Sequence, residues 1–122
     1  MRLRTLLKSK IHRATVTEAN VDYIGSIAID CDLIERVDIV AGELVHVWDV
    51  DNGERFETYV MEAPHGSGVV CVNGAAAHRV KVGHKVIITA FALTDEPVEP
   101  KMILVDEHNR FRQYLFLSPH HK

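Results

Sequence analysis

The segment "DNGE", residues 51–54, places an Asn-Gly pair between two runs of alternating apolar and polar residues. Asn and Gly readily adopt the left-handed backbone conformation that tight turns between antiparallel strands require. The flanking runs "ELVHVWDV" (43–50) and "RFETYVM" (55–61) therefore predict an antiparallel hairpin. This hairpin commits the middle of the chain to β-structure.

Most of the remaining chain has the same pattern, in which short runs typical of strands are separated by turn residues. Further strands are expected over 10–19, 26–30, 69–72 and 81–93, and in a final hairpin over 101–117. A short helix is expected over 30–42, where Asp30 or Asp32 caps the start and Gly42 closes the segment. Six or seven short strands with one or two short helices predict an all-β domain. A small closed barrel is favoured, with a sandwich as the competing geometry.

A chain of 122 residues is expected to form a single domain spanning 1–122. Its 14 Lys and Arg against 17 Asp and Glu give a net charge of −3, which argues against a dedicated nucleic-acid binder. No apolar run is long enough to cross a membrane, and no signal peptide is apparent. Cys31 and Cys71 form no CxxC pair, so the expected compartment is the cytoplasm.

The pair Gly25-Ser26 in "DYIGSIAID" (22–30) interrupts a run that is otherwise expected to be a strand. One interpretation is a bulge that turns the corner of a barrel. The other is chemical: a serine hydroxyl can attack the preceding carbonyl and convert the amide into an ester. That shift requires a strained peptide held by the surrounding fold. The residues alone favour the bulge.

Several other residues have side chains suited to binding or catalysis. Lys10 and His12 are two apart, and Arg55 and Tyr59 are four apart, so each pair shares one face of a strand. Arginine can bind a carboxylate through two parallel hydrogen bonds, and the tyrosine phenol can donate or accept a proton. A polar outer face explains Arg55 and Tyr59 equally well. The small residues of "NGAAA" (73–77) allow a close approach to the backbone.

Two other kinds of site find little support. The eight histidines show neither HxH nor HExxH spacing, and His120 and His121 lie in the tail, so no metal site is expected. A hydrolase using Ser67 or Cys71 is a weaker alternative, because neither residue has a recognisable nucleophile context.

Three motifs, in order, resemble those of the pyruvoyl-dependent aspartate 1-decarboxylases: "KSKIHRATVTEANVDYIGSIAID" (8–30), "WDVDNGERFETY" (48–59) and "VNGAAAH" (72–78). The resemblance covers about residues 1–95. It implies a double-psi β-barrel, an inactive proenzyme and a homotetramer. The activity it implies is a lyase that converts L-aspartate to β-alanine and CO₂ for pantothenate and coenzyme A synthesis.

The resemblance further implies that the chain cleaves itself between Gly25 and Ser26, giving a β-chain 1–25 and an α-chain 26–122. Elimination from the ester and loss of ammonia would convert Ser26 into a covalent pyruvoyl group. That group forms a Schiff base with the substrate and accepts electrons as CO₂ leaves, so neither pyridoxal phosphate nor a metal is needed. An accessory maturation factor stays an open alternative.

The resemblance also implies a role for individual residues. Ser26 and Tyr59 are catalytic, with Tyr59 reprotonating the substrate carbon, and Tyr23 supports the cleavage point. The residues expected to contact substrate are Lys10, His12, Arg55, Thr58, Asn73, Gly74, Ala75 and Ala76.

One difficulty accompanies these roles, because strand alternation puts Thr58 on the face opposite to Arg55 and Tyr59. An active site between subunits is the favoured resolution; a bulge or a strand end are the others. The alternative function is a non-catalytic small β-barrel that serves as a binding or assembly module.

Overall fold

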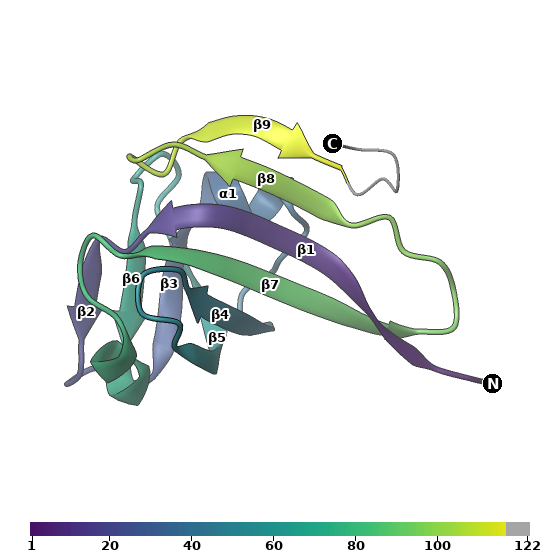
Figure 1. Cartoon of the computed structure of the whole chain (residues 1–122), viewed down its shortest axis with the longest axis horizontal. Coiled ribbons are helices and arrows are strands. Elements are labelled where there is room, and N and C mark those ends of the chain that lie inside the picture. The colour runs from purple at the N-terminus through teal and green to yellow at the C-terminus, as the bar shows by residue number, and fades with distance from the viewer. Residues whose placement is uncertain (117–122) are drawn as a thin grey trace.

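The structure is a computed structural model that describes residues 1–116, and strands dominate it (Figure 1). The elements in chain order are β1 (Arg4–Thr15), β2 (Glu18–Asn20), β3 (Ser26–Asp30), α1 (Cys31–Arg36), β4 (Leu44–Asp49), β5 (Arg55–Ala63), β6 (Val70–Asn73), the 3₁₀ helix η1 (Gly74–Arg79), β7 (Lys85–Thr94), β8 (Lys101–Val105) and β9 (Phe111–Leu115). The predicted class, mainly β with one or two short helices, is confirmed. No described helix is long and apolar enough to cross a membrane.

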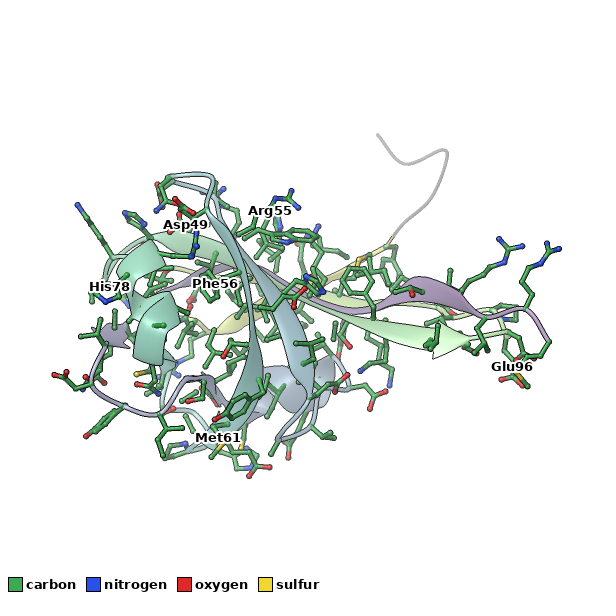
Figure 2. All side chains as sticks on the ribbon, turned by 90° about the horizontal axis from the view of Figure 1, so that it is seen from below. Asp49, Arg55, Phe56, Met61, His78 and Glu96 are labelled. Atoms are coloured by element: carbon green, nitrogen blue, oxygen red, sulfur yellow. The ribbon has the colours of Figure 1, made fainter. Side chains whose placement is uncertain are left out.

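The described strands follow one another in the sheet order β2-β6-β3-β5-β4-β7-β1-β8-β9. Neighbours are antiparallel except for the pairs β1–β8, β2–β6 and β3–β5, which are parallel. The sheet bends so that the β3–β6 part stands across the long strands β1 and β7 (Figure 1). Beyond the body of the molecule, the N-terminal part of β1 and the C-terminal part of β7 extend together as a ribbon, with Glu96 near its tip (Figure 2).

One face of this sheet is apolar across four successive strands. The register aligns Ile11 of β1 with Ile88 of β7, Ile88 with Val47 of β4, and Val47 with Phe56 of β5. The first three of these side chains are fully buried and belong to a single hydrophobic cluster, against which Phe56 packs. Because successive residues of a strand point to opposite faces, this row fixes which side chains point away from the core.

The hairpin predicted around Asn52-Gly53 is present, with β4 and β5 paired from Trp48 and Arg55 onward and Gly53 at a φ of +76°. The strand expected over 10–19 is divided instead: β1 ends at Thr15, after a bulge in which Arg13 has a φ of 66°. The helix expected over 30–42 is shorter, because α1 ends at Arg36 and Asp38 adopts a φ of 60°. Asp30 caps its start by accepting a hydrogen bond from the Asp32 N–H, as predicted.

The prediction of a strand through Gly25 was wrong. Residues 21–25 form a turn between β2 and β3, and the strand begins at Ser26. The apolar side chains that suggested a strand there are exposed: Val21 by 46%, Tyr23 by 63% and Ile24 by 85%. Gly25 therefore lies at the end of an exposed turn, and no strand bulge is needed to explain it.

Asn109 joins three segments that are distant in the sequence. Its side-chain amide donates to the carbonyl oxygens of Thr15 (2.9 Å) and Gly68 (2.8 Å), and its Oδ1 accepts from the Thr15 N–H at 2.7 Å. The residue is buried and has a φ of 61°, a conformation that asparagine tolerates better than most residues. Asn109 thus connects the β8–β9 turn to the end of β1 and to the loop before β6.

Replacing Asn109 tests this connection. Asn109→Ala leaves buried backbone groups without partners and forces alanine to a positive φ, so we expect a loss of roughly 2–4 kcal/mol in the free energy of unfolding. Urea denaturation measures it. Asn109→Gly, which relieves only the backbone strain, should be less destabilised by about 1 kcal/mol. An unchanged denaturation midpoint for Asn109→Ala would contradict this account.

Candidate active site

The Ser26 hydroxyl is held by hydrogen bonds at the start of β3. The Asn73 Nδ2 donates to Ser26 Oγ at 3.2 Å, and the hydroxyl donates to the Ile24 carbonyl oxygen at 3.3 Å. Ser26 and Asn73 are partners in the antiparallel β3–β6 ladder, so the backbone brings them together across 47 positions of sequence. Ser26 is 5% exposed, which removes its hydroxyl from bulk water.

The backbone around Gly25 is in close contact with Gly74. A Cβ atom at Gly74 would lie 2.5 Å from the Gly25 Cα and 2.8 Å from the Gly25 nitrogen, distances that no side chain tolerates. Gly74 also has a φ of +79°, which favours glycine. Position 74 therefore requires glycine both for space and for conformation, and its backbone packs directly on the Gly25-Ser26 junction.

The remaining residues of "NGAAA" form the start of η1. Asn73 occupies the N-cap position but makes no capping hydrogen bond, because its side chain is used at Ser26 instead. Ala75 is exposed, whereas Ala76 is partly buried against the core. Tyr23 contributes its carbonyl oxygen, 3.2 Å from the Cβ position of Gly74, while its side chain is exposed.

Sheet register places Tyr59 on the same face as Ser26. Ile27 of β3 pairs with Val60 of β5, and continuing this parallel register by one residue puts Tyr59 beside Ser26. Arg55 shares this face with Tyr59, as the alternation predicted, and the burial pattern of β5 confirms it. Thr58 points to the other face, where it is partly buried and pairs with Val45.

Arg55 lines a shallow hollow on the face of the sheet opposite to the core. The hollow has a volume of about 400 Å³ and is lined by His46, Trp48, Arg55, Phe56 and Glu57. The guanidinium lies 4.7 Å from the centre of the Trp48 ring, a distance suited to a cation–π contact. Figure 2 shows Arg55 directed outward and Phe56 directed inward. Among the described residues, no carboxylate pairs with Arg55, so its hydrogen-bond donors can bind an anionic ligand.

Lys10 and His12 lie on this same face, but on β1. Lys10 pairs with Thr89, which pairs with His46, which pairs with Glu57. Burial, together with the positive charges of Lys10 and Arg13, lowers the pKa of His12, so its imidazole is neutral at pH 7. The buried His12 Nδ1 has no hydrogen-bond partner within residues 1–116.

Two sets of predicted site residues therefore lie apart from each other in the chain. Gly25, Ser26, Asn73 and Gly74 are in contact with one another. Lys10 and His12 are on β1, separated from β5 by β7 and β4, which corresponds to roughly 14 Å at the usual strand spacing. Within the described chain, no hydrogen bond or ion pair connects Lys10, His12 or Arg55 to the Ser26 group.

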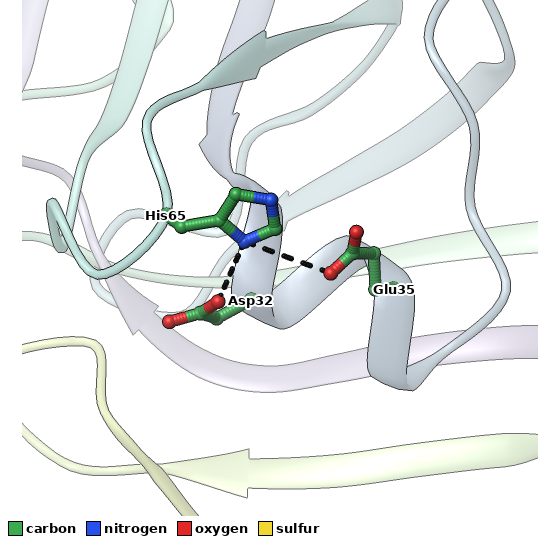
Figure 3. Close-up of side chains that lie close together, drawn as sticks. All are labelled: Asp32, Glu35 and His65. Carbon is green, nitrogen blue, oxygen red and sulfur yellow. Dashed lines mark hydrogen bonds and ion pairs between the residues drawn. The ribbon is translucent and has the colours of Figure 1, made fainter.

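A larger hollow than the one at Arg55 lies between α1 and β9, with a volume of about 700 Å³. At its edge, His65 Nδ1 lies 2.7 Å from Asp32 Oδ1 and 3.6 Å from Glu35 Oε2 (Figure 3). The hydrogen bond to Asp32, followed by the charge of Glu35, raises the pKa of His65. These side chains are exposed, and they link the loop after β5 to the first turns of α1. We take the Ser26 group rather than this hollow as the candidate site, because Asp32 and Glu35 lie against His65, Arg110 lies 3.8 Å from Asp30, and Arg36 stacks on Phe111.

Comparison with known proteins decides the family. A family model described as "Aspartate decarboxylase" matches residues 1–112, which is most of the chain. The chain belongs to the aspartate decarboxylase family. The resemblance seen in the sequence motifs is thereby confirmed.

Curated relatives of this family agree. The chain is 54% identical over 110 residues to a protein named "Aspartate 1-decarboxylase" from Acetivibrio thermocellus, a match that covers 87% of each chain. It is 55% identical over 109 residues to one of the same name from Caldicellulosiruptor saccharolyticus, covering 86% of this chain and 85% of the relative. Among solved structures, the rationally designed protein mkDPBB_sym_86 is 21% identical with a TM-score of 0.47, over 63% of this chain and 90% of that chain.

Sequence reasoning missed three residues near these groups. Trp48 and His46 alternate with the buried Val47 in "ELVHVWDV", so the same face argument that selected Arg55 also applies to them. The third residue is Cys71, on β6. Its alternation with Asn73 in "VVCVNG" already places the two on one face of a strand.

The hydrogen-bonded pair of His65 and Asp32 leads to a prediction about how stability depends on pH. Because the folded-state pKa is raised above the ordinary value of 6.5, the stabilisation is complete below 6.5 and is lost as the pH rises through the folded-state value. His65→Gln should therefore lower the free energy of unfolding more at pH 6 than at pH 9, as measured by urea denaturation. His78→Gln, which removes an exposed histidine on η1, is the control. Equal losses at both pH values for His65→Gln would refute the assignment.

Proposed function

We propose that this protein is a self-processing aspartate 1-decarboxylase, which converts L-aspartate to β-alanine and CO₂ for pantothenate and coenzyme A synthesis. Family membership supports the reaction. The observation that carries the self-processing is the Ser26 hydroxyl, which is held by Asn73 directly after a glycine whose backbone packs on Gly74. We further propose that the protein acts in the cytoplasm and forms one domain, the double-psi β-barrel that family membership implies.

The first reaction is on the chain itself. Ser26 Oγ forms a bond to the Gly25 carbonyl carbon, the Gly25–Ser26 C–N bond breaks, and the hydroxyl proton passes to the Ser26 nitrogen. The amide becomes an ester without any other reactant. The close contact with Gly74 supports this step, because it limits the positions that the Gly25 peptide can adopt. Elimination of the Gly25 carboxylate leaves dehydroalanine at position 26, and one water then supplies the ketone oxygen as the nitrogen leaves as ammonia, which gives fragments 1–25 and 26–122.

The resulting pyruvoyl group supplies the electron sink that loss of CO₂ from an amino acid requires. The small residues around position 26 fit such a group, because Gly25 and Gly74 leave backbone rather than side chains beside it. Arg55 binds a substrate carboxylate through its guanidinium, with Lys10 as a second cation. Tyr59 holds a phenolic proton on the same face as Ser26 and delivers it to the substrate carbon.

We propose that the complete site forms between subunits of a homotetramer. The support is geometric: Lys10 lies three strands from β5, so Lys10 and Arg55 of one chain lie far apart for a substrate as short as aspartate. His12, which is neutral, lies on the same face of β1 as Lys10 and contacts the substrate beside it. Thr58, on the inner face of β5, contributes to processing, and Ala75 and Ala76 contribute backbone groups at the start of η1.

Intact-mass analysis of the purified protein tests the self-processing. We expect two fragments divided between Gly25 and Ser26, with the larger fragment resistant to Edman degradation because its N-terminus is a ketone. Ser26→Ala removes the attacking oxygen and should abolish both cleavage and decarboxylation. A single full-length chain after prolonged warm incubation of the wild-type protein would refute the proposal.

Substitution of Arg55 separates binding from processing. Arg55→Ala removes a charge-assisted contact worth about 1.5–3 kcal/mol, so kcat/KM for L-aspartate should fall roughly 10- to 150-fold. Within residues 1–116 no hydrogen bond or ion pair joins Arg55 to the Ser26 group, so the fraction of cleaved chain should remain at the wild-type level. The test is a steady-state assay of CO₂ release, normalised to the cleaved fraction. Unchanged kcat/KM would remove Arg55 from the site, and loss of cleavage would give it a structural role instead. Arg112→Ala, at an exposed arginine on β9, is the matched control.

A further inference from the structure

Cys71 lies on the same face of the sheet as Ser26, two residues along the ladder from the cleavage site. It is on β6, paired with Ala28 of β3 on one side and with Glu18 of β2 on the other. Two residues further along β6 is Asn73, whose side chain lies on the same face. The Cys71 thiol donates to Asn73 Oδ1 at a Sγ–Oδ1 distance of 3.2 Å.

The two polar atoms of the Asn73 amide group thus have opposite hydrogen-bonding roles. Its Oδ1 accepts from the thiol, and its Nδ2 donates to Ser26 Oγ. If the amide were rotated by 180°, its oxygen would face Ser26 and its NH₂ would face Cys71. The thiol proton is what favours the observed orientation, because a thiol is a poor acceptor for the NH₂ group.

Two features keep that proton on the sulfur. Burial is the main cause that raises the pKa of the Cys71 thiol; the negative charge of Glu18 and a hydrogen bond with its side chain raise it further, and the hydrogen bond with Asn73 acts in the opposite direction. The side chain is also buried at 6% exposure, so water does not compete for Asn73 Oδ1. A neutral thiol with a single proton therefore faces the amide oxygen.

We propose that Cys71 is a positioning residue for self-cleavage: its thiol holds the Asn73 amide in the orientation that presents Nδ2 to Ser26 Oγ. With this orientation, Oγ accepts one hydrogen bond and directs its own proton to the Ile24 carbonyl. The oxygen is thereby fixed next to the Gly25 carbonyl carbon that it attacks. This inference rests on the proposed self-processing, and it adds a residue that never contacts the reacting atoms.

The test measures the rate of cleavage of newly purified full-length protein by intact mass over time. Cys71→Ala and Cys71→Val, which lack the donor, should cleave roughly tenfold more slowly than wild type. Cys71→Ser retains a donor and should restore most of the rate, a rescue that a merely space-filling role would not give. Cys31→Ala is the matched control, because Cys31 is also buried but lies beyond the opposite end of β3. It should cleave at the wild-type rate.

A double-mutant cycle completes the test. If Cys71 acts through Asn73, adding Cys71→Ala to Asn73→Ala should cause no further loss of rate. Wild-type rates for both Cys71→Ala and Cys71→Val would overturn the inference while leaving the self-processing intact. So would a Cys71→Ser variant as slow as Cys71→Ala, or an additive loss in the double mutant. Absence of cleavage in the wild-type protein would overturn the self-processing itself.

Discussion

The pairing of β3 with two different neighbours fixes the position of the whole candidate site. On one side β3 is antiparallel to β6, which puts Ser26 opposite Asn73; on the other it is parallel to β5, which aligns Ile27 with Val60. Ile27 and Ile29 are fully buried, so the core holds this register. A slip by one residue would turn both isoleucines out of the core and Ser26 away from Asn73.

Much of the fold could be predicted from local sequence. The predictions that were wrong have a common cause. The Asn52-Gly53 turn and the alternating runs beside it give the β4–β5 hairpin without tertiary information. By contrast, the alternation around Tyr23 and Ile24 indicates a strand, yet these side chains lie in an exposed turn. Periodicity reports only whether a segment is able to lie on an apolar surface, and the rest of the chain determines whether such a surface is available.

The sequence predicted the strand face on which each candidate side chain lies, but it did not predict which candidate residues are in contact. Alternation alone correctly placed Arg55 and Tyr59 on one face of β5 and Thr58 on the other. The contact between Gly25 and Gly74, and the Asn73–Ser26 hydrogen bond, join residues nearly fifty positions apart and follow from the strand order, which no local pattern contains. The family motifs identified these residues but did not indicate which of them meet within a single chain.

The position of β1 in the sheet has a consequence for the cleaved molecule. β1 lies between β7 and β8, and β2 pairs with β6, so the segment before Gly25 is integrated into the sheet at two places. Breaking the backbone after Gly25 would create one new chain end at the turn and one at the buried start of β3, and it would leave the pairing of β1 and β2 in place. Residues 1–25 would then persist as a tightly held peptide, and the mature protein would resemble a two-chain complex whose smaller partner supplies a central strand. Such a peptide would separate from the larger chain only under denaturing conditions.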